Sequence, residues 1–166
     1  IAMLAPTVGF IAIDRNCAAL IAREPDEFDK VLNVDSADVR EPLKSVIKMT
    51  PQTMLDAGEW GNFIAYDDET RRVVGSCGYK TPPAPNGSIE IAYVTFPPYE
   101  GQGFATAMVG ALVSYALDSI DVSEVIAHTP PEANASTKIL EKCAFQRAGE
   151  ANDPEVGPVW RWRYGP

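Results

Sequence analysis

The sequence predicts an α+β protein built on a mixed, mostly antiparallel sheet of six to seven strands, flanked by about four helices. Strand-like runs of apolar and β-branched residues follow one another from residue 60 to residue 96, and helical spacing of apolar residues recurs after them. The chain has 166 residues, 46% of them hydrophobic, which is enough for one buried core. We therefore expect a single domain over residues 1–166.

The first third of the chain is expected to begin with a strand and to continue in helices. Residues 7–13 form an apolar run, and Asp14 is a suitable N-cap for a helix that Pro25 then interrupts. Residues 28–34 can add a further helical turn or two. The segment 35–57 has mixed signals, and we expect short helices there.

The middle of the chain predicts three antiparallel strands in succession. Residues 60–66 and 72–80 form a hairpin around a turn at 67–70. The proline-rich stretch 81–87 cannot supply ladder hydrogen bonds, so it is expected to be a loop before the next strand at 88–96.

The second half predicts a β-α-β-like unit and a closing strand. Apolar residues recur at helical spacing over 103–119 and again over 134–143. A short strand is expected at 125–129, between the two helices, and a last strand at 159–164.

Charge and composition exclude several classes of function. The formal charge of −9 disfavours nucleic acid as a partner, because affinity for phosphates comes largely from Lys and Arg. No apolar run reaches the roughly 18 to 20 residues of a membrane span, and the first residues lack the pattern of an export signal. Cys17, Cys77 and Cys143 suggest no disulfide framework, and one histidine, His128, cannot form a multi-histidine metal site. We expect a cytoplasmic protein without a metal.

A glycine-rich turn between the strand at 88–96 and the following helix is the most informative segment. Such a junction directs unpaired backbone N–H groups and the positive end of a helix dipole at one point, which suits a phosphate. Neither the P-loop nor the dinucleotide fingerprint fits, because Phe104 and Ala105 follow Gly103 and Thr106 stands at the third glycine position. The alternative to a phosphate-binding turn is a glycine-rich turn that only caps a core helix.

This turn and its flanks resemble the signature of the GNAT acetyltransferase superfamily, in which Arg or Gln precedes x-x-Gly-x-Gly or Ala. Residues 100–105, Glu-Gly-Gln-Gly-Phe-Ala, match its spacing. The segments 90–93 (Glu-Ile-Ala-Tyr), 97–99 (Pro-Pro-Tyr) and 101–106 (Gly-Gln-Gly-Phe-Ala-Thr) look closest to the branch that acetylates N-terminal amines of ribosomal proteins. Together they favour a GNAT-like fold.

A second set of matches lies downstream. That branch has Ala-x-Thr, then Glu-Asn-x-x-Ser, then Leu-Glu-Lys-x-Gly-Phe, and this chain has Ala-His-Thr at 127–129, Glu-Ala-Asn-Ala-Ser at 132–136 and Leu-Glu-Lys-Cys-Ala-Phe at 140–145. Three residues depart from the pattern. Glu100 stands for Arg or Gln, Ala133 for Asn and Ala144 for Gly.

The resemblance implies acetyl-CoA as co-substrate and a set of residues that bind it. It places a bulge in the strand between Ala92 and Phe96, whose backbone would hold the acetyl carbonyl and pantetheine. The implied cofactor-binding residues are Val94, Thr95, Phe96, Gly101, Gln102, Gly103, Phe104, Ala105, Thr106 and Asn134.

The resemblance also implies catalytic roles, each with a simpler alternative. Glu90 is the candidate base, acting through water, or a solvent-facing strand residue. Ser136 is the candidate donor to the departing thiolate, since Leu140 stands where many relatives carry a tyrosine, or it only caps its helix. Tyr93 can replace Ser136 as donor, or it only packs in the sheet.

The implied function is an acetyl-CoA-dependent N-acetyltransferase, in which a primary amine attacks the thioester directly within a ternary complex. The acceptor would be a small amine or a protein N-terminus, with residues 35–57 beside its site. Glu100 and Ala133 motivate an alternative, a catalytically weak acyl-CoA-binding or sensing module. A nucleotide-binding protein is the third reading. Monomer and homodimer leave no distinguishing mark in the sequence.

Overall fold

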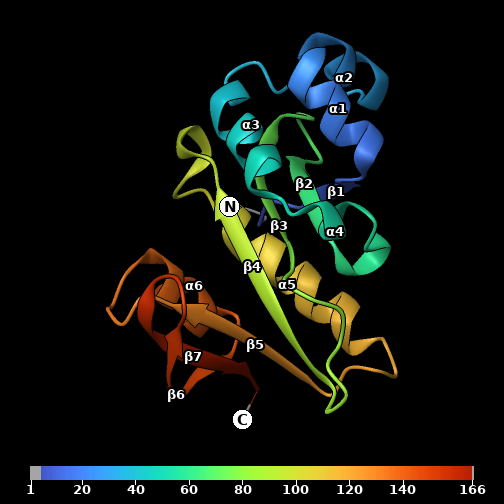
Figure 1. The fold of residues 1–166 in the computed structure, drawn as a ribbon. Coiled ribbons are helices and arrows are strands. Elements are labelled where there is room, and N and C mark those ends of the chain that lie inside the picture. Colours follow the sequence, from blue (N-terminus) through green and yellow to red (C-terminus); the bar gives the residue numbers. More distant parts are fainter. Residues whose placement is uncertain (1–4, 166) are drawn as a thin grey trace.

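A seven-stranded sheet forms the centre of the computed structural model, which describes residues 5–165 (Figure 1). The strand order is β1-β2-β3-β4-β5-β7-β6. The strands are β1 (Val8–Ala12), β2 (Asn62–Asp67), β3 (Val73–Tyr79), β4 (Ser88–Thr95), β5 (Glu124–Thr129), β6 (Phe145–Asp153) and β7 (Gly157–Tyr164). The expected α+β class is confirmed.

Six α-helices accompany the sheet in the described part of the chain, rather than about four. They are α1 (Arg15–Arg23), α2 (Pro25–Leu32), α3 (Arg40–Met49), α4 (Gln52–Leu55), α5 (Phe104–Leu117) and α6 (Ala135–Lys142). Two short 3-10 turns cover Gly58–Trp60 and Pro97–Tyr99. Over residues 5–165, none of these helices has the length and apolar content needed to cross a bilayer.

The sheet is antiparallel except at its middle. Strands β2 to β4 pair antiparallel in chain order, as expected, and β1 pairs antiparallel with β2. Strands β5, β7 and β6 form a second antiparallel group. Strands β4 and β5 are parallel and are connected through α5, which confirms the β-α-β unit.

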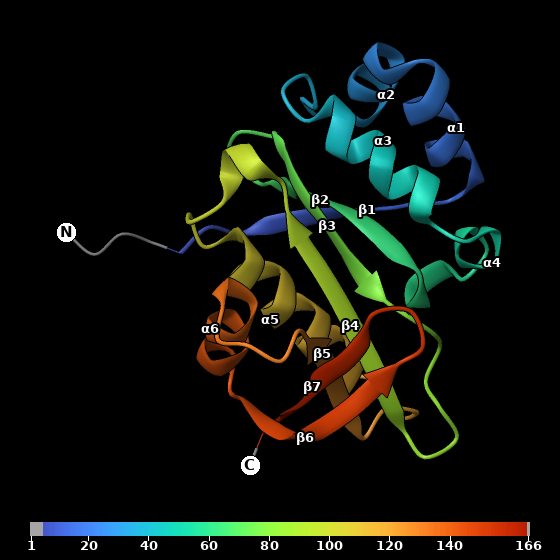
Figure 2. The ribbon, with the colours of Figure 1, turned by 60° about the vertical axis from the view of Figure 1, so that its left-hand side comes forward.

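Helices cover both faces of the sheet. Figure 2 shows α5 on one face and α1, α2 and α3 on the other. Tyr79 on β3 lies opposite Ile91 on β4, and both are buried on the α5 face. The Tyr79 hydroxyl donates a 2.6 Å hydrogen bond to the carbonyl of Leu112, which ties α5 to the sheet.

Strands β4 and β5 run together over a short length and then separate. Their pairing covers Ser88 to Glu90 against Glu124 to Ile126, although β4 continues to Thr95. Figure 1 shows the two strands meeting at one end and diverging toward the other. The sheet is therefore open beside the second half of β4.

The structure differs from the sequence-based prediction at the bulge and at strand β6. The bulge expected between Ala92 and Phe96 is absent from the pairing of β4 with β3, whose register continues without a shift from Tyr79–Ile91 to Gly75–Thr95. The opening of the sheet comes instead from the loss of β5 as a neighbour. Strand β6 was not expected, because it is a mostly exposed edge strand and lacks the apolar alternation that marks a half-buried one.

Ala144 adopts a backbone conformation that favours glycine. It follows α6 with φ of 66°, in the left-handed region where glycine commonly ends a helix. Replacing Ala144 with Gly should raise the free energy of unfolding by up to about 1 kcal/mol, because the steric cost of a β-carbon is removed. Urea denaturation measures this change. Ala133→Gly, at an exposed loop residue without positive φ, should give no gain, and an equal gain there would refute the explanation.

Candidate functional site

Two cavities meet at the second half of β4. The first, here called the α3 cavity, measures about 580 Å³ and lies between α3 and strands β3 and β4. The second, here called the α5–α6 groove, measures about 470 Å³ and lies between β4 and the beginnings of α5 and α6. Tyr93 and Val94 line both cavities. A molecule in one cavity can therefore meet a molecule in the other at these two residues.

The N-terminus of α5 opens into the α5–α6 groove. Gly103 is its N-cap with φ of 90°, and no side chain caps the helix. The Ala107 N–H bonds to the Gly103 carbonyl, so the N–H groups of the preceding first turn have no partner within the helix. These groups and the helix dipole favour an anion.

Two lysines on α6 add positive charge to the same groove. Lys138 and Lys142 are four residues apart, lie on one side of the helix and line the groove, as does the exposed Glu100 on the opposite loop. The lysines offset the carboxylate that replaces the usual Arg or Gln. Their four-residue spacing on an expected helix was the signal available in the sequence.

The structure brings most of the predicted cofactor-binding residues into the groove. Those that line it are Val94, Thr95, Gly101, Gly103, Phe104, Ala105 and Thr106. The Thr95 hydroxyl is buried and has no hydrogen-bond partner within residues 5–165. Its hydrogen-bonding capacity is therefore not used by this part of the chain.

Three predicted cofactor-binding residues lie elsewhere. Phe96 is buried and lines the α3 cavity. The Gln102 amide donates to the Pro98 carbonyl at 3.3 Å, outside the groove lining. The Asn134 side chain accepts a hydrogen bond from the Thr137 N–H and caps α6.

Backbone groups of β4 also face the open side of the sheet. The Glu90 carbonyl accepts from Lys80, and the Phe96 N–H donates to Val74, so even-numbered residues of β4 bond to β3. Successive residues of a strand direct their backbone N–H and C=O groups to opposite sides. The groups of Tyr93 and Thr95 therefore point away from β3. They form an edge where an extended molecule can add its own hydrogen bonds.

Tyr93 places a hydroxyl next to the first turn of α6. Its O–H donates to the Ser136 carbonyl at 3.2 Å, and Ser136 itself lines the groove. Burial raises the pKa of Tyr93 to about 12, so the hydroxyl is protonated at neutral pH. Leu140 is fully buried and has no hydroxyl, whereas both predicted donors, Tyr93 and Ser136, line the groove.

Glu90 lies on the same face of β4 as Ala92 and Val94, but farther from the meeting point of the cavities. Its Oε2 atom is 3.0 Å from Lys80 Nζ and 3.1 Å from His128 Nδ1. Glu90 lines neither cavity.

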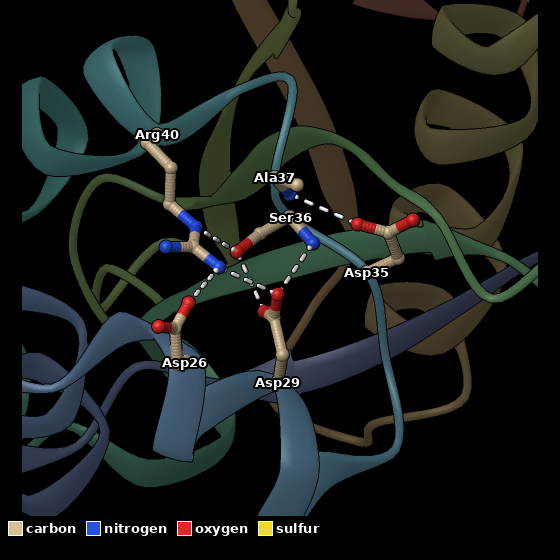
Figure 3. A network of polar contacts seen from close by, with 6 residues as sticks. All are labelled: Asp26, Asp29, Asp35, Ser36, Ala37 and Arg40. Carbon is tan, nitrogen blue, oxygen red and sulfur yellow. Dashed lines mark hydrogen bonds and ion pairs between the residues drawn. The ribbon is translucent and has the colours of Figure 1, made fainter.

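Helix α3, which walls the α3 cavity, is held by a polar network with Arg40 at its centre (Figure 3). Arg40 Nη2 lies 2.8 Å from Asp29 Oδ2 and 3.1 Å from Asp26 Oδ1, and Nε donates to Ser36 Oγ at 2.9 Å. The fully buried Ser36 hydroxyl donates to Asp29 Oδ1 at 2.6 Å. The network fixes the start of α3 against α2.

The chain is similar in sequence to known proteins. Residues 18–146 match the family model described as the acetyltransferase (GNAT) domain. The chain is 30% identical over 129 residues to the uncharacterized N-acetyltransferase p20 of Bacillus licheniformis, covering 78% of this chain and 72% of that protein.

Solved structures show the same fold at low sequence identity. A Vibrio cholerae protein with the provisional name ribosomal-protein-serine acetyltransferase superposes with a TM-score of 0.69 at 13% identity, covering 100% of this chain and 98% of that one. The spermidine N-acetyltransferase of Vibrio cholerae in complex with CoA and spermine gives 0.63 at 14% identity, covering 95% and 94%.

The network around Arg40 predicts a measurable contribution to stability. Arg40→Met leaves the largely buried Asp29 without its guanidinium partner and should lower the free energy of unfolding by about 1 to 3 kcal/mol. The midpoint of urea unfolding should fall while the slope m stays unchanged. Arg15→Met, which removes an ion pair between half-exposed side chains, is the control and should cost less. Equal losses in the two variants would argue against a special role for the network.

Proposed function

Since the chain belongs to the GNAT acetyltransferase family, we propose that it transfers an acetyl group from acetyl-CoA to a primary amine. The observation that supports this most is the meeting of two cavities at Tyr93 and Val94. The α5–α6 groove would take acetyl-CoA and the α3 cavity the amine. Both reactants would then be held together, which replaces a bimolecular encounter by an oriented one.

The residues present fit acetyl-CoA. Its pyrophosphate would be bound by the free N–H groups at the start of α5, with Lys138 and Lys142 as counter-charges. Its pantetheine amides would pair with the outward backbone groups of Tyr93 and Thr95. The unpartnered Thr95 hydroxyl adds one more hydrogen-bonding group on this wall.

The transfer is proposed to proceed by direct attack, without an acyl-enzyme. When bound, acetyl-CoA supplies a thioester whose carbonyl carbon accepts the amine. Cys77 lines the α3 cavity, but burial raises the pKa of its thiol, so the nucleophilic thiolate is suppressed. Backbone N–H groups at the meeting point would stabilise the oxyanion.

Two proton transfers complete the reaction. We assign donation to the leaving thiolate to Tyr93, with Ser136 as the neighbouring hydroxyl, because Tyr93 lies at the junction of the cavities and keeps its proton at neutral pH. Glu90 would accept the proton of the amine through a water molecule, because its side chain lines neither cavity. Lys80 and His128 would then position its carboxylate.

The acceptor is proposed to be a small amine or a protein N-terminus. The structural neighbour that was solved with CoA and spermine supports amine chemistry on this fold. The exposed carboxylate of Glu100 in the groove favours a second candidate, an acyl-CoA sensor with weak turnover. Release of free thiol on addition of amine separates the transferase from the sensor.

The cofactor site is tested by calorimetric titration with acetyl-CoA, with ATP and NAD as controls. We expect a dissociation constant in the micromolar range, about −8 kcal/mol, for acetyl-CoA alone. Combining Lys138→Gln with Lys142→Gln should weaken binding about tenfold and reduce its dependence on salt, because two counter-charges are lost. Lys30→Gln, on α2 and outside the groove, is the matched control. An unchanged affinity of the double variant for acetyl-CoA would show that the two lysines do not contribute to the cofactor site.

The donor role is tested with Tyr93→Phe, which keeps the ring and removes the proton. We expect kcat to fall about 100-fold while the KM for acetyl-CoA changes little, as for loss of a general acid. In the parent protein, a pKa of about 12 means that Tyr93 should cause no loss of activity up to pH 10. Tyr164→Phe, on β7 and outside both cavities, should behave as the parent. If Tyr93→Phe kept the full kcat of the parent protein, Tyr93 would not be the proton donor. Ser136 would then be the candidate, and Ser136→Ala would be the next variant to assay.

A further inference from the structure

The α3 cavity carries no charged side chain on its lining in the described chain. Its apolar members are Pro42, Val46, Met49, Cys77, Ala92, Val94, Phe96 and Pro97, and its polar members are Ser45, Thr50, Asn62, Ser76 and Tyr93. The protein as a whole has a net charge of −9, so neutral walls are not a consequence of composition. They distinguish this cavity from the α5–α6 groove, whose lining includes Glu100, Lys138 and Lys142.

Part of the polar lining is already engaged within the protein. Ser76 donates its hydroxyl to the Phe63 carbonyl at 3.1 Å, and Thr50 donates to the Val46 carbonyl at 2.7 Å. The Tyr93 hydroxyl is bonded to Ser136. These hydroxyls keep lone pairs that can accept a hydrogen bond, but they are neutral, so the lining offers no counter-charge to a second cationic group of a ligand.

Besides Pro97, two larger apolar side chains are left open to solvent on the same wall. Met49 is 81% exposed and Val94 is 47% exposed, and both line the cavity. Burial of such surface by a ligand is favourable, at roughly 25 cal/mol per Å². The flexible Met49 thioether can adapt to the shape of an apolar group.

On the basis of the proposed function, we infer that the acceptor is a monoamine whose body is apolar and uncharged, rather than a polycation. Its carbon skeleton packs against Val46, Met49 and Val94, and its single amine points to the junction at Tyr93. An ammonium loses solvation in a neutral cavity, which lowers the pKa of the amine and favours the neutral nucleophile. A second ammonium of a polyamine finds no carboxylate on these walls and remains unpaired, which costs binding energy.

The same chemistry can come from a small amine or from a peptide whose first residue is apolar. The test therefore compares 2-phenylethylamine, a tetrapeptide that begins with leucine, a tetrapeptide that begins with lysine, and spermidine, each assayed by thiol release from acetyl-CoA. We expect kcat/KM for an apolar acceptor to exceed that for spermidine at least tenfold. The ranking of kcat/KM among the two peptides and 2-phenylethylamine shows whether the acceptor is a small amine or a peptide N-terminus.

A charge variant makes the test specific to the cavity. Met49→Glu places a carboxylate on the exposed part of the lining, so it should fold normally, lower kcat/KM for 2-phenylethylamine and raise that for spermidine. Ile120→Glu, at a fully exposed residue outside the cavity, adds the same charge and should leave the ratio unchanged.

Opposite results separate this inference from the proposed function. Faster turnover of spermidine than of every apolar amine, or a ratio that Met49→Glu does not move, would overturn the inference. Binding of acetyl-CoA without turnover of any apolar amine would also overturn it, while the proposed cofactor site would stand. Absence of acetyl-CoA binding would overturn both.

Discussion

The end of pairing between β4 and β5 at Glu90 and Ile126 is the constraint on which the other features depend. Beyond it, β4 keeps β3 on one side and has an open edge on the other. The N-terminus of α5 and the lysines of α6 face this opening, and the α3 cavity lies against the opposite face of the same strand segment. A sheet paired to the end of β4 would have neither the free edge nor the junction at Tyr93.

Much of the fold could be predicted from the sequence because its central elements have clear periodicity. The strands at 62–67, 73–79 and 88–95 and the helix at 104–117 differ from their expected limits by at most two residues. Strand β6 could not be predicted, since an exposed edge strand has no apolar alternation. Helix α3 was obscured by its charged outer face, and its position depends on long-range bonds of Arg40 to Asp26 and Asp29.

The candidate site was predictable where a local motif defines it. The glycine turn and the first turn of α5 lie in the groove because strand, turn and helix are contiguous. Side chains brought in by other elements were harder to anticipate: Lys138 and Lys142 reach the groove only through the packing of α6 beside α5. The resemblance implies that Asn134 binds the cofactor, but in the structure its side chain caps the start of α6.

Among residues 5–165, the two cavities share only Tyr93 and Val94, and this limits how mutations in them can interact. The walls of the α3 cavity come mostly from the chain before residue 98, and those of the groove mostly from the chain after it. Residues of α3 and of α6 line different cavities, so substitutions on the two helices should combine additively, except through the shared pair. With the two cavities assigned as proposed, acceptor preference can diversify among descendants of this sequence while cofactor affinity is maintained by a separate set of residues.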